Sequence, residues 1–191
     1  MLAARVFWRS FFIFLPASGK RDVAVVVEQQ TMKTLIVMRH ARTEPDSPDG
    51  DFARKLTAKG AADAAAAAEQ IASLNLWPDR IVTSGAARAF ATAGIVAARL
   101  QPGKSPTVDS RIYDAEVPAL VHVVQELSGD CRTVVMVAHN PGVEDFVDQL
   151  AAGHANVAFT PAAFAVLDFE SEAWDELGPS SGVVRNTWRP A

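Results

Sequence analysis

Three short apolar runs organise most of the chain, and residues that can carry chemistry follow each of them. The runs occupy residues 35–38, 81–83 and 133–138, and helix-forming sequence comes after each run. A continuous apolar run of this length is typical of a strand that is buried on both faces of a sheet. Strands that alternate with helices indicate an α/β fold. We therefore expect a three-layer α/β/α domain with a mainly parallel central sheet.

The segments between the runs carry the signals of helices. Residues 57–74 are rich in alanine, and Thr57 can cap the start of that helix. Pro118 suits the first turn of another helix. The predicted helices cover residues 57–74, 86–100, 117–127 and 141–150. Two later apolar runs, residues 164–169 and 183–188, are expected to form a hairpin-like pair of strands with a longer connection.

The residues that follow the three strands point to one site. Arg39 and His40 follow the first strand, Arg88 follows the second, and His139 follows the third. Ligands of parallel α/β sheets bind outside the carboxyl ends of the strands, so these side chains can converge. Guanidinium groups match the oxygens of a tetrahedral anion, and helix N-termini add backbone N–H donors. The sequence predicts an anion site with phosphate as its occupant.

Composition disfavours several other kinds of function. The chain has 191 residues and a formal net charge of −4, so it lacks the basic excess that neutralises a nucleic-acid backbone. The single cysteine, Cys131, allows neither an internal disulfide nor a cysteine-based zinc site. Arginines around two histidines disfavour a metal ion. A neutral imidazole is a nucleophile, and guanidinium charges beside it lower its pKa below about 6.5, which favours phosphoryl transfer through histidine.

Four motifs occur along the chain, each at a strand end or a helix start. They are Leu35-Ile36-Val37-Met38-Arg39-His40, Arg54-Lys55-Leu56-Thr57, Ser84-x-x-x-Arg88-Ala89-x-x-Thr92-Ala93 and Ala138-His139-Asn140-Pro141. Together they resemble the motifs of the histidine phosphatase superfamily, and within it those of the small SixA-type phosphohistidine phosphatases. The resemblance covers residues 33 to about 189 and implies the phosphoglycerate mutase-like fold of that superfamily.

The resemblance also implies a phosphatase that works through a covalent intermediate. In that scheme His40 is the nucleophile and is transiently phosphorylated, and water then releases phosphate. Arg39, Arg88 and His139 bind the phosphoryl oxygens, and Arg54 is a further phosphate contact. No metal or organic cofactor is required. The implied substrate is phosphohistidine on a signalling or phosphotransfer protein.

The proton donor is the least defined part of the predicted site. Larger relatives carry a glutamate between the second arginine and the distal histidine, and Asp114 and Glu116 are the nearest residues here. The same two residues also fit a solvated loop before a helix, where Glu116 would suit the helix dipole. The imidazole leaving group of phosphohistidine needs less acid assistance than an alkoxide. The absence of a clear proton donor in the sequence therefore favours a substrate with a P–N bond.

Two other functions stay open on the sequence. One is a small-molecule phosphomonoesterase or phosphoglycerate-mutase-like enzyme, although such relatives usually carry an insertion over the site, and only about 50 residues separate Arg88 from His139. The other is a non-catalytic phosphate-binding module, which would have no need of a nucleophile at His40. His122 and His154 are expected to lie outside the site.

Residues 1–31 differ from the rest of the chain. Their apolar stretch is interrupted by Arg9 and is shorter than the ~20 residues that a membrane-spanning helix needs. Met32 directly precedes the first predicted strand, so we expect the natural start there and a domain over residues 33–189, with residues 1–31 outside the fold. A targeting segment is the alternative. We expect a cytoplasmic protein without stable membrane association.

Overall fold

The computed structural model describes residues 10–13, 25–28, 32–153 and 158–191. The chain divides into two compact units, residues 1–31 and 32–191. In the first unit, β1 (Ser10–Ile13) pairs antiparallel with β2 (Val25–Glu28), a pairing that the sequence analysis did not predict. The remaining residues of 1–31, on which the alternative of a targeting segment also depends, lie outside the described residues. Both the start at Met32 and the exclusion of residues 1–31 from the domain stay predictions.

The second unit is built on a mixed six-stranded sheet. Its strands are β3 (Met32–Arg39), β4 (Arg80–Thr83), β5 (Thr107–Val108), β6 (Thr133–Ala138), β7 (Phe164–Glu170) and β8 (Val183–Trp188). They lie in the order β5-β4-β6-β3-β7-β8. The pairs β5–β4, β4–β6 and β6–β3 are parallel, and the pairs β3–β7 and β7–β8 are antiparallel.

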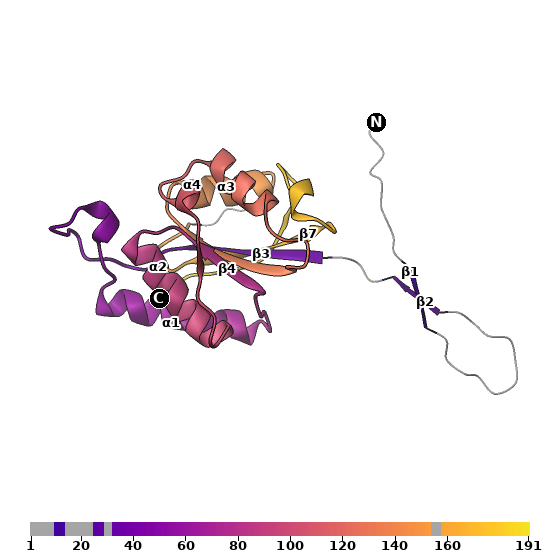
Figure 1. The fold of residues 1–191 in the computed structure, drawn as a ribbon, viewed down its shortest axis with the longest axis horizontal. Coiled ribbons are helices and arrows are strands. Elements are labelled where there is room, and N and C mark those ends of the chain that lie inside the picture. The colour runs from indigo at the N-terminus through magenta and orange to yellow at the C-terminus, as the bar shows by residue number, and fades with distance from the viewer. Residues whose placement is uncertain (1–9, 14–24, 29–31, 154–157) are drawn as a thin grey trace, which may run out of the picture. The chain divides into compact units, whose positions relative to one another are not determined.

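Helices cover both faces of the sheet and complete the three expected layers. They are α1 (Ala58–Ser73), α2 (Ala87–Leu100), α3 (Val117–Gln125) and α4 (Gly142–Leu150). The helices α1 and α2 lie on one face, and α3 and α4 lie on the other (Figure 1). Short 3₁₀ turns lie in the loops as η1 (Asp51–Ala53), η2 (Ser110–Ile112) and η3 (Trp174–Glu176).

The local sequence signals account for most of these elements. The run 35–38 is fully buried in the centre of the sheet, as its continuous apolar character predicted. Thr57 caps α1 by accepting a hydrogen bond from the backbone N–H of Gly60. Each predicted helix ends within two residues of the expected position. The two-residue strand β5 was not predicted, because two residues are too short to show any periodicity.

The prediction of a mainly parallel sheet is only partly right, because β7 runs antiparallel to β3. After α4 the chain returns to the carboxyl end of the sheet before β7 begins, where Ala162 donates its backbone N–H to the His40 carbonyl. A strand that enters at that end must run against β3. The strand β8 then follows as the hairpin-like partner of β7, with a shift of the pairing register between Val166 and Leu167.

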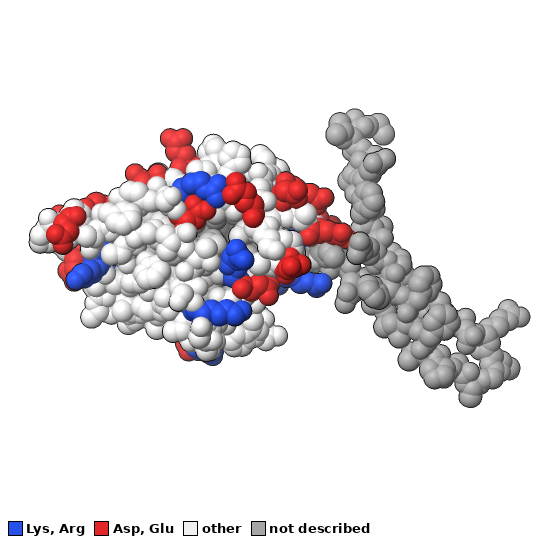
Figure 2. Space-filling view, in the orientation of Figure 1, with Lys and Arg blue, Asp and Glu red and all other residues white. Residues whose placement is uncertain are grey.

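The surface carries charge of both signs. On the face shown in Figure 2, acidic and basic side chains lie in small groups separated by uncharged residues. Among the described residues no helix is long and apolar enough to cross a membrane.

Candidate active site

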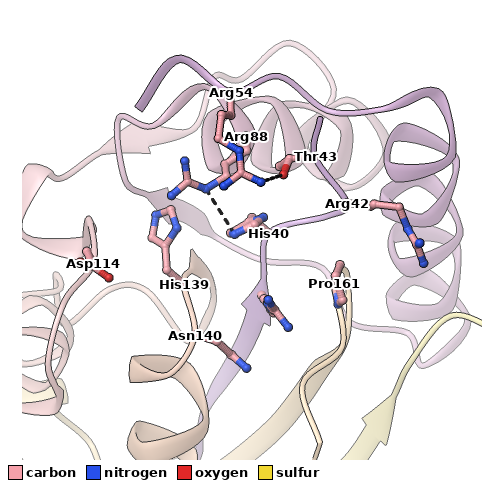
Figure 3. Close-up of a pocket in the computed structure, with 10 residues that line it drawn as sticks. His40, Arg42, Thr43, Arg54, Arg88, Asp114, His139, Asn140 and Pro161 are labelled. Atoms are coloured by element: carbon pink, nitrogen blue, oxygen red, sulfur yellow. Dashed lines mark hydrogen bonds between the residues drawn. The ribbon is translucent and has the colours of Figure 1, made fainter. Parts of the chain in front are cut away.

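A pocket of about 370 Å³ opens at the carboxyl ends of β3, β4 and β6. It is lined by Arg39, His40, Arg42, Thr43, Arg54, Arg88, Asp114, His139, Asn140 and Pro161 (Figure 3). The pairing of the strands explains how residues far apart in the sequence meet here. Arg39 stands beside Ala138 in the β3–β6 ladder, so His40 and His139 leave the sheet side by side. Their ring centroids are 5.1 Å apart.

His40 is held with one particular ring nitrogen directed at Arg88. Its Nδ1 lies 2.8 Å from the carbonyl oxygen of Ala41, and this oxygen can only accept, so Nδ1 carries the proton. Its Nε2 accepts a hydrogen bond from Nε of Arg88 at 3.3 Å. The lone pair of the ring is therefore on Nε2. Nδ1 is the donor and Nε2 is the nitrogen able to act as a nucleophile.

The neighbours of His40 are tied together by a buried threonine. The hydroxyl of Thr92 donates to the carbonyl oxygen of Arg88 at 2.7 Å and accepts from the backbone N–H of Ala41 at 3.0 Å. Thr92 therefore links the segment that carries His40 to the helix that carries Arg88. This contact gives a physical role to the threonine of the motif that begins at Ser84.

Arg88 lies in the first turn of α2, and the loop before α1 fixes its guanidinium. The Nη1 atom donates to the carbonyl oxygen of Asp51 at 2.7 Å, and Nη2 donates to its carboxylate at 2.9 Å. The same carboxylate accepts from Nη1 of Arg54 at 2.9 Å and from the hydroxyl of Tyr113 at 2.9 Å. These hydrogen bonds lower the pKa of Asp51 to about 2, and the one from Arg54 contributes most to the shift. Asp51 is thus an anion that two arginines share.

Asp51 and Tyr113 are site neighbours that the sequence analysis missed. The available signal was the spacing Asp51-x-x-Arg54, since residues three apart face each other on a helical turn, here η1. No comparable signal connects Tyr113 to Asp51, which lies 62 positions earlier.

Arg39 lines the pocket from the end of β3, and its side chain is anchored to the segment that precedes β7. Its Nη1 donates to the carbonyl oxygen of Phe159 at 2.7 Å. Its Nε is buried and has no hydrogen-bond partner among the described residues. Burial lowers the pKa of Arg39, and the nearby carboxylate of Glu144 opposes that shift. The Nε–Nη2 edge of the guanidinium therefore makes no hydrogen bond among the described residues.

His139 is buried beside His40 and contacts the end of β4. Its Nε2 lies 2.7 Å from the hydroxyl of Ser84. Its Nδ1 is buried and has no partner among the described residues. Buried polar atoms are normally hydrogen-bonded. Among the described lining residues, three side-chain atoms are buried without such a partner: Nδ1 of His139, Nε of Arg39 and Oδ1 of Asn140.

The two histidines are held neutral. Burial lowers the pKa of His40 to about 4, and the charges of Arg88 and Arg39 add to the shift. Burial likewise lowers the pKa of His139 to about 3, with His40 and Arg88 as further causes. The sequence analysis predicted the direction for His40 and attributed it to the arginines. The structure makes burial the larger cause.

Arg54 and Arg42 line the pocket in different ways. Arg54 donates to the carbonyl oxygen of Glu44 and to the hydroxyl of Thr43, in addition to Asp51, so its guanidinium is fixed. The side chain of Arg42 points away from His40 (Figure 3).

The two candidate proton donors are placed differently. Asp114 lines the pocket, and its backbone φ is 47°. In the view of Figure 3 it lies on the side of His139 away from His40. Glu116 is the N-cap position of α3 and does not line the pocket. His122 lies in α3 outside the pocket, and His154 falls outside the described residues.

Within the described part of the chain, no group of three or more histidine, cysteine, aspartate or glutamate side chains is placed to hold a metal ion. The pocket instead gathers guanidinium groups and neutral imidazoles. This donor set suits a tetrahedral oxyanion.

The family model for the histidine phosphatase superfamily (branch 1) matches residues 35–117, which include His40 and Arg88. A structure assigned as the phosphohistidine phosphatase SixA of Nakamurella multipartitia is 25% identical, with a TM-score of 0.72, and the match covers 83% of this chain and 96% of the other. The chain belongs to the histidine phosphatase superfamily. Its fold is of the SixA type.

Other comparisons place this histidine phosphatase more broadly. A protein histidine phosphatase SixA complexed with tungstate is 23% identical, with a TM-score of 0.70 over 82% of this chain and 96% of the other. The mycobacterial glucosyl-3-phosphoglycerate phosphatase shares the fold at 19% identity and a TM-score of 0.58, over 84% and 100%. An uncharacterized chloroplastic protein of Arabidopsis thaliana is 25% identical over 177 residues, which are 87% of this chain and 80% of the relative.

Proposed function

We propose that this phosphatase hydrolyses phosphohistidine on a protein through a covalent phosphoenzyme on Nε2 of His40. The observation that carries the proposal is the state of His40. Its ring is neutral, with Nδ1 held by the carbonyl of Ala41 and the lone pair of Nε2 facing Arg88. A neutral, oriented imidazole beside fixed cations is what phosphoryl transfer through histidine requires.

The donors around His40 support a bound phosphoryl group. The guanidinium of Arg88 already contacts Nε2, so a phosphorus atom at that nitrogen would bring its oxygens to Arg88. The unpartnered Nε of Arg39 and Nδ1 of His139 supply further contacts from buried positions. Fixed donors in a buried site stabilise the charge of the transition state without reorganisation. Arg54, which is engaged with Asp51, is proposed as an outer phosphate contact.

The proposed reaction has two displacement steps. In the first, the lone pair of His40 Nε2 bonds to phosphorus while the bond from phosphorus to the substrate ring nitrogen breaks. If the other ring nitrogen of the substrate carries a proton, the substrate leaves as neutral imidazole. In the second, water attacks phosphorus, the P–Nε2 bond breaks, and its electron pair returns to His40. The water contributes its oxygen to phosphate and releases a proton, and no step uses a metal ion.

Two features support a P–N substrate. Asp114 is the single carboxylate among the lining residues, and it is solvent-exposed, which is a weak arrangement for a general acid. The chain between α2 and β6 is also short and is used for β5, η2 and α3. The accessible pocket therefore suits a phosphoryl group that projects from the surface of another protein.

The proposal is tested by comparing substrates side by side. We expect a phosphohistidine protein to be hydrolysed with a kcat/KM at least about 10²-fold above that of a phosphoserine peptide or a sugar phosphate, because an alkoxide leaving group needs an acid. Equal or faster hydrolysis of a sugar phosphate would contradict it. That outcome would favour the alternative, a small-molecule phosphomonoesterase, for which the shared fold of the glucosyl-3-phosphoglycerate phosphatase is the supporting observation. A wild-type protein that binds phosphate but hydrolyses none of these substrates would favour the non-catalytic phosphate-binding module.

A further inference from the structure

We infer that Glu144 is a positioning residue for Arg39: through the backbone of Phe159 it holds the guanidinium in the orientation that binds the phosphoryl group. The inference rests on the proposed function in taking the pocket as a phosphoryl site. It concerns a residue that none of the four motifs places in the site.

The contacts form a short chain from α4 to the pocket. The carboxylate oxygen Oε1 of Glu144 accepts from the backbone N–H of Phe159 at 2.9 Å and from Nδ2 of Asn140 at 2.8 Å. The carbonyl oxygen of Phe159 in turn accepts from Nη1 of Arg39 at 2.7 Å and from the same Nδ2 of Asn140 at 3.3 Å. Glu144 therefore fixes one residue by its N–H, and that residue fixes Arg39 by its C=O.

Arg39 depends on this anchor because it has no carboxylate of its own. Arg88 and Arg54 are both fixed by direct ion pairs with Asp51, at 2.9 Å each. Arg39 makes no ion pair within 4.0 Å among the described residues, and the one hydrogen bond of its side chain is to the Phe159 carbonyl. The position of that carbonyl thus decides whether the Nε–Nη2 edge of the guanidinium faces the pocket.

The negative charge of Glu144 and its contact with Phe159 predict opposite effects on phosphate binding when the side chain is removed. A carboxylate near an anion site repels the anion, so its removal should tighten phosphate binding if charge is all that matters. If Glu144 acts by holding Phe159, its removal should weaken binding, because Arg39 loses its orientation. The sign of the change therefore separates positioning from the effect of charge.

The chain offers a matched control for the charge. Asp145 lies next to Glu144 in the first turn of α4, is exposed, and makes no side-chain hydrogen bond among the described residues. Asp145→Asn removes the same charge from the same turn and leaves Phe159 in place. Glu144→Gln removes the charge but keeps an oxygen that can accept both hydrogen bonds.

The test measures the binding of inorganic phosphate by calorimetry at pH 7 to full-length protein. We expect Glu144→Ala to weaken phosphate binding about tenfold, within the range of coupled contacts. Glu144→Gln should stay within about threefold of the wild type, and Asp145→Asn should bind as well as the wild type or slightly better. Thermal unfolding of each variant shows that it is folded. Glu144→Asp, which keeps the charge and shortens the reach, replaces Glu144→Ala if that variant does not fold.

A double-mutant cycle with Arg39 decides whether the effect passes through that side chain. In an Arg39→Ala background, Glu144→Ala should change the dissociation constant of phosphate by less than about twofold, whereas in an Arg88→Ala background it should keep its full effect. A full tenfold effect in the Arg39→Ala background, or tighter binding by Glu144→Ala, would overturn the inference. Wild-type protein that binds phosphate and hydrolyses no phosphohistidine would overturn the proposed function and leave this result standing. Wild-type protein that binds no phosphate would overturn both.

Discussion

Arg88 donates from Nε to Nε2 of His40 across 3.3 Å, while the backbone carbonyl of Ala41 holds the opposite nitrogen of the same ring at 2.8 Å. The ring is therefore fixed in one tautomer, and its lone pair faces the guanidinium of a buried arginine. In the proposed reaction a phosphoryl oxygen replaces Nε2 as the acceptor of Arg88, and phosphorus takes the place in front of the lone pair. This pair of residues defines both the nucleophilic atom and the direction of attack.

The first prediction concerns pH. His40 must be neutral to attack, and its pKa is lowered to about 4, mainly by burial. As the pH falls, His40 is protonated only near that value, so kcat/KM should hold from neutral pH down to about 5 and fall near pH 4. The measurement is the pH profile of kcat/KM, with the separately titrated ionisation of the substrate factored out. An acidic limb at pH 6.5 or above would show an ordinary, exposed histidine.

The second prediction concerns Asp51, which the structure places against Arg88 and Arg54. Asp51→Ala removes the carboxylate that fixes both guanidinium groups, and we expect kcat/KM to fall about tenfold or more because preorganised donors are lost. Asp49→Asn, a change at an exposed carboxylate of the same loop, should leave kcat/KM within about twofold of the wild type. Equal losses in the two variants would mean that only the net charge of the loop matters.

The third prediction separates the two candidate acids. Asp114 lines the pocket and Glu116 does not, so Asp114→Asn should slow hydrolysis of an alkyl phosphate about 10²-fold if an acid operates, whereas Glu116→Gln should have little effect. With phosphohistidine both variants should stay close to the wild type. The four rates, two substrates by two variants, are the measurement. A large loss for Glu116→Gln alone would assign the acid to Glu116.

The sequence predicted the part of the site that strand ends carry. His40, Arg88 and His139 follow buried apolar runs, and a general rule of α/β sheets brings such positions together. Asp51 and Glu144 lie outside that rule. Asp51 contacts Arg88 from a loop, and Glu144 contacts the backbone of Phe159, 15 positions later in the chain. Side-chain-to-backbone contacts between segments far apart leave no periodic signal. The mixed sheet was missed for a related reason, since the path of the chain before β7 decides its direction.

The fourth prediction concerns how α4 packs beside the site. A Cβ added at Gly142 would lie 2.1 Å from the carbonyl oxygen of Ala115, whereas one added at Gly94 in α2 would meet no atom within 4 Å. Gly142→Ala should therefore lower the free energy of unfolding by about 1–3 kcal/mol, as overpacking does. Gly94→Ala should raise it by about 0.5–1 kcal/mol, because alanine is the better helix former. Chemical denaturation of both variants is the measurement. Equal changes in the free energy of unfolding would show that the loop that carries Ala115 moves to make room for the added methyl group.

The central claim is that His40 carries the phosphoryl group, and trapping that intermediate tests it most directly. Wild-type protein is mixed with a ³²P-labelled phosphohistidine protein, quenched within milliseconds in alkali, and digested for mapping. The account predicts label on the peptide that contains His40, lost on brief acid treatment and absent from an inactive His40→Ala variant. An unlabelled wild-type protein together with a His40→Ala variant that still hydrolyses the substrate would contradict it.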